Sequence, residues 1–262
     1  MKIINLKKSL LLSVAFFLFS SNTNIKTVNY ISPQIYSSSQ IWIVLTEKWS
    51  SMQGNLYIID KANDKIWHLA TKKINVTLGK NGLSWGKGLL SIEEETQKKE
   101  GDKCTPAGIF HLGDLYLRDP ILQKASNHKF YIITKDMVAV DDPKSSFYNS
   151  IVRKSSVLSD WSSCEPMYSI PQYDFVIPIL HNSEGTPGSG SCIFFHKWSS
   201  PTSPTAGCVA TSLSSFKQIL NVYKPKAKPL MIILTHELYN ELRKQTEGFL
   251  PNIEQIKTTV KD

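Results

Sequence analysis

The sequence predicts a mostly β domain over about residues 41–235, sandwich-like or barrel-like, with a mixed sheet and a few short helices. Apolar and β-branched runs of about four to eight residues recur through the chain, separated by Gly, Pro, Asn and Asp. Helical periodicity, by contrast, is clear in only two segments. The hydrophobic share of 41% over 262 residues can build a packed core, which excludes a disordered chain.

Each of the apolar runs is expected to form a strand, because short runs bounded by turn-forming residues are typical of buried or half-buried strands. The predicted strands lie near residues 41–45, 56–60, 65–69, 74–78, 108–112, 130–134, 175–180, 191–196, 207–210 and 230–234.

Two helices are expected near the C-terminus. Ser212 is a suitable N-cap for a helix in which Leu213, Phe216 and Leu220 share one face, and this helix should end before Pro225. A shorter helix is expected over residues 237–245. Residues 236–262 are therefore predicted to form a C-terminal helix followed by a polar tail, loosely packed from residue 247 onward.

The first 21 residues have the pattern of a secretory signal peptide. Lys2, Lys7 and Lys8 precede a charge-free apolar stretch over residues 10–19, which is too short to span a bilayer comfortably. No clear small-residue cleavage motif follows, so a retained N-terminal anchor with membrane association and a core helix are the alternatives. We expect an exported protein of the periplasm or cell envelope, with residues 22–40 as a linker to the domain.

The net charge limits the classes of partner. The formal charge is +8, and loss of three lysines with the signal peptide would leave about +5. Such an excess suits loose association with an acidic polymer such as the cell wall. No stripe of basic and aromatic residues predicts nucleic-acid binding, and the sequence leaves the oligomeric state open.

Cys208 is the first candidate for chemistry. It follows Gly207, which permits an unusual backbone turn, and a predicted helix begins shortly after it. Backbone N–H groups near the sulfur would then stabilise a thiolate or a developing oxyanion. The alternative is a small buried cysteine at the end of a strand.

His196 favours the chemical interpretation of Cys208. It closes a predicted strand, and a loop of eleven residues rich in Ser, Pro and Thr leads from it to Cys208. If the two strands are neighbours, the imidazole and the thiol come within hydrogen-bond reach. The imidazole would then accept the thiol proton, and the ion pair would lower the pKa of the thiol towards or below neutrality. The alternative is a histidine buried in the core.

Six short motifs occur in order along the chain. They are G-K-N-G-L-S-W-G-K-G from Gly79, G-D at Gly101 with T-P-A-G-I-F from Thr105, V-D-D-P-K-S-S-F-Y-N from Val140, Y-D-F-V-I from Tyr173, G-S-C-I-F-F-H from Gly190, and T-A-G-C-V-A from Thr205. Together they resemble the YkuD-type L,D-transpeptidases of bacterial cell walls, in the subgroup with Thr-Ala-Gly-Cys-Val-Ala. Each motif is weak alone, but their number and order make the resemblance specific.

The resemblance implies a YkuD-like catalytic domain that acts on peptidoglycan stem peptides. A cysteine attacks the L,D peptide bond after the third residue of a tetrapeptide donor, and the terminal D-alanine leaves. The thioester then passes its acyl group to a side-chain amine of another stem, which gives a 3-3 crosslink, or to water. By position, Cys208 would be the nucleophile and His196 the general base and later acid. The N–H groups of Gly207 and Cys208 would be oxyanion donors, and Thr205 would orient the imidazole.

The sequence departs from the family pattern on both sides of the cysteine. Many members have a second histidine directly before Gly-Cys and an arginine two residues after the cysteine, where this chain has Ala206 and Ala210. The missing arginine removes an obvious carboxylate clamp, which leaves the acyl acceptor open. An L,D-carboxypeptidase or endopeptidase with the same site, and an inactive peptidoglycan-binding module, are therefore kept as alternatives.

No metal or organic cofactor is expected. His181 and Cys192, together with His196 and Cys208, could be drawn as a zinc set, but closely spaced pairs of ligands are absent. In an exported chain Cys104 could pair with Cys164 or Cys192, although the sequence does not give the connectivity.

Three polar or glycine-rich segments are expected to be structural. The glycines at 79, 82, 86 and 88 are expected in turns, since they do not match a phosphate-binding loop. Asp141 and Asp142 precede a proline and are expected in an Asx-type turn rather than as an acid–base pair. The lysines at 98, 99 and 103, among four glutamates, are expected in a solvated loop.

Overall fold

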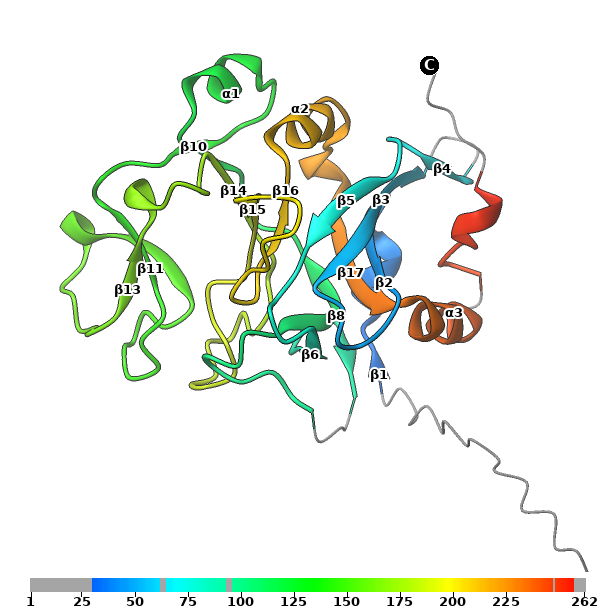
Figure 1. The fold of residues 1–262 in the computed structure, drawn as a ribbon, viewed down its shortest axis with the longest axis horizontal. Coiled ribbons are helices and arrows are strands. Elements are labelled where there is room, and N and C mark those ends of the chain that lie inside the picture. The colour runs from blue at the N-terminus through cyan, green and yellow to red at the C-terminus, as the bar shows by residue number, and fades with distance from the viewer. Residues whose placement is uncertain (1–29, 62–64, 93–95, 247, 257–262) are drawn as a thin grey trace, which may run out of the picture.

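The chain forms a mostly β domain with mixed sheets and few helices, as the sequence predicts (Figure 1). The computed structural model describes residues 30–61, 65–92, 96–246 and 248–256. The largest sheet contains β2 (Gln40–Thr46), β3 (Gln53–Lys61), β4 (Trp67–Leu69), β5 (Ile74–Thr77), β6 (Leu83–Trp85), β8 (Thr105–His111), β9 (Tyr116–Leu117), β10 (Tyr131–Ile132), β14 (Phe175–Pro178), β15 (Phe194–Lys197), β16 (Val209–Thr211) and β17 (Leu230–Thr235). Their order is β10-β9-β14-β15-β16-β5-β3-β2-β17-β8-β6, with β4 paired to β3.

The centre of this sheet is β2, whose residues are all buried. It pairs in parallel with β17 and antiparallel with β3, so Ile43 lies between Ile232 and Tyr57. A strand buried on both faces is expected to be a continuous apolar run, and the sequences of β2 and β17 both follow this pattern.

Three α-helices lie among the described residues. In α2 (Leu213–Val222) the side chain of Ser212 accepts the N–H of Ser215, which confirms the predicted N-cap. This helix stacks Phe216 on Phe175 of β14. The second predicted helix is α3 (His236–Gln245), which packs against β2 and β17. The short α1 (Pro120–Ala125) was not predicted.

The ten predicted strands are all present, with ends that differ for backbone reasons. The strand expected over residues 191–196 begins only at Phe194, because Cys192 has a φ of 54° and interrupts the extended chain. Similarly, β16 begins after Gly207, which has a φ of 145°. The strand expected over residues 130–134 is reduced to the two residues of β10.

A separate three-stranded sheet was not predicted from the sequence. It consists of β11 (Met137–Val140) between β12 (Ser150–Arg153) and β13 (Cys164–Pro166), all antiparallel, and we call it the cap sheet. Two of its strands are short and end in charged or proline residues, so they carry no clear apolar alternation. Figure 1 shows the cap sheet beside the end of the main sheet that carries β14 and β15.

Both terminal segments are more ordered than expected. In the predicted linker, β1 (Tyr30–Ile31) pairs with β7 (Leu90–Ser91), and the 3-10 turn Pro33–Ser37 buries Ile35 completely. In the predicted loose tail, Leu250 is buried and Phe249 packs edge-on against Trp67. Apolar side chains therefore extend the core at both ends, up to the 3-10 turn Ile253–Gln255.

Within the described residues, no helix has the length and apolar character needed to cross a membrane. The apolar stretch over residues 10–19, and with it the predicted signal peptide, lies outside that part of the chain.

Candidate active site

The strands that carry the predicted site residues are neighbours in the main sheet. β15 and β16 run parallel, with Phe195 opposite Val209 and His196 opposite Ala210. Cys208 directly precedes β16, and the loop over residues 198–207 makes the return from one strand to the other. The topology therefore brings the thiol and the imidazole to the same region of the sheet.

Thr205 and Gly207 shape the turn that presents Cys208. A β-carbon at Gly207 would lie 3.0 Å from the carbonyl oxygen of Cys104, so only glycine fits without displacing the neighbouring chain. Thr205 Oγ1 accepts the N–H of Gly207 at 3.1 Å and donates to the carbonyl of Cys208 at 2.6 Å. Thr205 thus fixes the turn, which corrects the expectation that it orients the imidazole.

These contacts also change the expected set of oxyanion donors. The N–H of Gly207 is already used by Thr205. The N–H of Cys208 donates to no residue in the described part of the chain, so it is the group that can still receive an oxyanion.

The thiol of Cys208 is held by the backbone of the preceding strand. Its Sγ accepts the N–H of Phe194 at 3.3 Å and donates to the carbonyl of Cys192 at 3.4 Å. Burial raises the pKa of the Cys208 thiol to about 12. The resting thiol is therefore neutral, which corrects the expectation of a thiolate near neutral pH.

The imidazole of His196 is also neutral. Its Nδ1 lies 2.8 Å from the carbonyl of Lys197, so Nδ1–H donates and Nε2 keeps its lone pair. Burial lowers the pKa of His196 to about 4. A histidine in this state can act as a base without first losing a proton.

The two groups make no hydrogen bond with each other in the structure. Continuing the parallel register places Cys208 beside Phe194, so His196 lies two residues further along the same face. Such diagonal neighbours are several ångströms apart but still within reach of an aromatic side chain. The arrangement can support cysteine nucleophilic chemistry in which the proton moves once a substrate is present.

Tyr173 and Glu165 complete the surroundings of the thiol, and neither role is predicted from the sequence. The ring of Tyr173 lies 5.4 Å from the ring of His196 and 5.7 Å from that of Phe194. Its hydroxyl donates to Oε2 of Glu165 at 2.5 Å. Burial raises the pKa of Glu165 to about 7. Tyr173 lies in a motif noted above, but nothing in the sequence around Glu165 signals the site.

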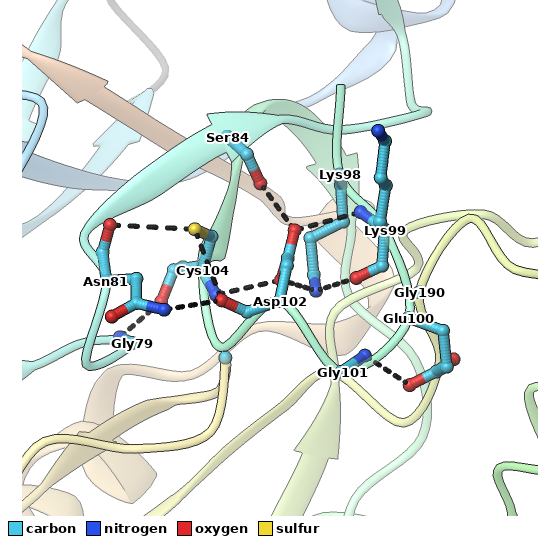
Figure 2. Close-up of polar contacts among 12 residues, drawn as sticks. Gly79, Asn81, Ser84, Lys98, Lys99, Glu100, Gly101, Asp102, Cys104 and Gly190 are labelled. Carbon is cyan, nitrogen blue, oxygen red and sulfur yellow. Dashed lines mark hydrogen bonds and ion pairs between the residues drawn. The ribbon is translucent and has the colours of Figure 1, made fainter. Parts of the chain in front are cut away.

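The loop over residues 98–105 packs against this turn, since a β-carbon at Gly207 would meet the carbonyl of Cys104. Figure 2 shows the polar contacts of Lys98, Asp102 and Cys104 that hold the loop. Lys98 is buried and forms an ion pair with Asp102, which also accepts the N–H of Cys104 at 2.9 Å. Lys98 therefore departs from the solvated loop that was expected, whereas Lys99 and Lys103 are exposed as expected. Thr105, next in the chain, donates to the carbonyl of Cys208 at 3.4 Å and accepts the N–H of Gly79 at 2.8 Å.

The other candidate constellations are structural in the described residues. His181 accepts the N–H of Lys87 on Nδ1 at 3.1 Å and contacts the carbonyl of Ser189 through Nε2 at 2.8 Å. No group of three His, Cys, Asp or Glu residues that could hold a metal gathers in this part of the chain. All four cysteines are free thiols, so none of the disulfides that the sequence left open among Cys104, Cys164 and Cys192 is formed in the structure.

The aspartates and glycines of the remaining motifs form turns. Asp142 accepts the N–H of Lys144 at 2.9 Å and that of Ser162 at 2.7 Å, which confirms the Asx-type turn. Gly82 adopts a φ of 76°, as a turn glycine does. A β-carbon at Gly79 would lie 2.4 Å from the carbonyl of Lys103, so that glycine permits a close approach of two chains.

A cavity of about 320 Å³ lies between the cap sheet and the main sheet. Asn149 and Ile151 line it from the cap sheet side, and Tyr116 and Phe194 line it from the main sheet. Phe194 also holds the thiol of Cys208, so this cavity adjoins the candidate site.

Comparison with known protein families gives one match that covers well over half of the chain. Residues 53–232 match the model of YkuD, the L,D-transpeptidase catalytic domain, and this interval contains every residue of the site described above. No curated protein and no solved structure gives a significant match.

Proposed function

The chain belongs to the family of L,D-transpeptidase catalytic domains, and from this premise we propose that it is an exported, cysteine-dependent L,D-transpeptidase of the cell envelope. Its substrates would be the tetrapeptide stems of peptidoglycan. The acyl group would pass through a thioester on Cys208 to an amine of a second stem, which forms a 3-3 crosslink, or to another amine.

The observation that carries this proposal is the neighbourhood of one thiol and one imidazole on parallel strands. Cys208 is half-buried and held by backbone groups, and His196 has its Nδ1 fixed by a carbonyl. Fixing one ring nitrogen leaves the other as the base, which is the arrangement that cysteine nucleophiles require.

Acylation would proceed without a preformed ion pair. As Sγ attacks the carbonyl carbon of the third stem residue, Nε2 of His196 takes the thiol proton, and the N–H of Cys208 faces the developing oxyanion. The C–N bond then breaks, and the imidazolium returns the proton to the amine of the leaving D-alanine. In the second step an amine or water attacks the thioester, and the C–S bond breaks.

Export is part of the same proposal. It is supported by Lys2, Lys7 and Lys8 ahead of the apolar stretch 10–19.

The proposal is tested by incubating the purified protein with a disaccharide tetrapeptide and resolving the products by mass. Dimers that have lost D-alanine are expected. Tripeptide alone would instead identify an L,D-carboxypeptidase, and unchanged substrate would support a binding module.

Two variants test whether Cys208 is the residue that forms the product. Cys208→Ser should abolish turnover and formation of the acyl-enzyme detected by mass spectrometry. The matched control Cys164→Ser should retain both. Turnover by Cys208→Ser at the wild-type rate would exclude catalysis by this thiol.

A further inference from the structure

The cap sheet brings a carboxyl group to the thiol. Glu165 lies on β13 opposite Ala139, and the adjacent pair joins Cys164 to Val140. The carbonyl of Val140 accepts from Sγ of Cys192 at 3.5 Å, so the cap sheet is attached to the segment whose backbone holds Cys208. The position of Glu165 relative to the thiol is therefore set by tertiary contacts.

Tyr173 orients this carboxyl group. Its hydroxyl engages Oε2 of Glu165, while its ring packs against His196. The second oxygen of Glu165, Oε1, has no hydrogen-bond partner in the described residues and is not sealed from solvent. One carboxyl oxygen is thus fixed, and the other is available to a ligand.

Tyr173 links Glu165 to the thiol: its hydroxyl donates to Oε2, and its ring lies 5.7 Å from that of Phe194, whose N–H donates to Sγ of Cys208. The charge of Glu165 is also one cause of the raised pKa of Cys208. A carboxylate at this position disfavours the thiolate form of Cys208. It would therefore slow acylation if acylation were the only step that the site served. The same charge attracts a cation to the position beside the sulfur. The geometry therefore suits a second substrate that arrives with a positive charge.

We propose that Glu165 receives the acyl acceptor: its carboxylate binds the incoming primary ammonium group and removes the proton that would otherwise block attack on the thioester. This inference rests on the proposed function and deepens it. A free aliphatic amine has a pKa near 10.4, so at neutral pH only on the order of one molecule in a thousand is uncharged. Water carries no charge and gains no such binding, so the carboxylate concentrates amines rather than water beside the thioester.

The transfer step balances in protons and bonds. The ammonium gives one proton to the carboxylate of Glu165, and the amine nitrogen attacks the thioester carbon. As the C–N bond forms and the C–S bond breaks, the second proton passes through Nε2 of His196 to the sulfur of Cys208. The products are an amide, a neutral thiol and a protonated Glu165, which then loses its proton to solvent.

The proton affinity of Glu165 fits this role. Burial raises its pKa to about 7, with smaller contributions from Asp141 and Glu100. The other titratable groups that face it are Tyr173 and the thiols of Cys192 and Cys208, and burial raises the pKa of all three. None of these three ionises near neutrality, so a change in transfer between pH 6 and 8 reports on the carboxyl group.

The test uses Glu165→Gln, which keeps the side-chain length and an oxygen that can accept from Tyr173. Full-length protein is acylated with disaccharide tetrapeptide, and separate samples then receive a primary alkylamine or hydroxylamine as the acceptor. Hydroxylamine is uncharged at neutral pH. The ratio of alkylamine transfer to hydroxylamine transfer should fall at least about tenfold in the variant. The matched control Glu237→Gln, an exposed carboxyl group on α3, should keep the wild-type ratio.

The pH profile and the outcomes of these experiments distinguish the role of Glu165 from the proposed transpeptidase function. Relative to Glu165→Gln, alkylamine transfer by the wild type should rise from pH 6 to 8. An unchanged nucleophile ratio, or equal losses with both nucleophiles, would refute the role of Glu165 and leave the transpeptidase intact. A wild-type protein that forms no acyl-enzyme would instead refute the proposed function, and this inference with it.

Discussion

At the level of single residues, the proposed nucleophile Cys208 and the proposed base His196 are both uncharged. Both groups are desolvated, and desolvation favours the neutral form of each: the pKa of the thiol rises to about 12 and that of the imidazole falls to about 4. The motif around Cys208 indicates which atoms react. The motif does not indicate whether Cys208 and His196 are protonated, because the side chains that bury them come from distant parts of the chain.

Alkylation of Cys208 tests this protonation state. A pKa raised from 9.0 to about 12 leaves about a thousandfold less thiolate than an ordinary thiol has at the same pH. Iodoacetamide should therefore modify Cys208 much more slowly than N-acetylcysteine at pH 7.5, and the rate should still rise at pH 10. The measurement is peptide mass spectrometry over time at each pH. Rapid modification at pH 6 to 7 would reveal a preformed thiolate–imidazolium pair and contradict the structure.

At the level of elements, the site depends on supports that join segments far apart in the sequence. The turn before Cys208 is held by the segment 98–105, whose centre is the ion pair of Lys98 and Asp102 (Figure 2). The Lys98 side chain is only 3% exposed. A charge buried to this degree needs its partner, so the pair fixes the loop whether or not it adds net stability.

Asp102→Asn removes that partner and should lower the free energy of unfolding by about 3 kcal/mol, because the ammonium group of Lys98 then stays buried without a countercharge. The double variant Lys98→Met/Asp102→Asn should recover most of this loss. Urea denaturation of the single and double variants gives the comparison. A loss below about 0.5 kcal/mol for Asp102→Asn would mean that the pair behaves like an exposed one.

At the level of the whole molecule, folding buries histidines and a glutamate whose pKa values shift in opposite directions. His181 and His196 both have their pKa lowered to about 4 by burial, whereas that of Glu165 is raised to about 7. Between pH 6.5 and 4.5 the unfolded chain protonates both histidines while the folded chain does not, so each contributes stability that is lost on acidification. Glu165 acts in the opposite direction. Its pKa is higher in the folded chain than in the unfolded chain, so acidification stabilises the fold through this group.

The free energy of unfolding should therefore fall by about 2 kcal/mol from pH 6.5 to 4.5, since two histidines act against one glutamate and each group contributes about that much within this range. Glu165→Gln removes the opposing group and should make the fall about twice as large. Chemical denaturation at several pH values measures both slopes. A stability that is flat over this range would show that the histidines are not buried in their neutral form.

The sequence by itself determined ten of the strands, because a fully buried strand such as β2 must be a continuous apolar run, and it determined α2 through its capping serine. It also determined the short region in which Cys208 and His196 meet, since both lie near one loop. These features depend on local pattern and on residues close together in the chain.

Only the tertiary structure decided the rest of the site. The cap sheet, the contact of Tyr173 with Glu165 and the support of Cys208 by Thr105 all join segments with no shared periodicity or spacing. Desolvation depends on how many atoms surround a group, whichever part of the chain supplies them. The local motifs thus identify the residues proposed to react, whereas the protonation states and neighbours of these residues arise from long-range packing.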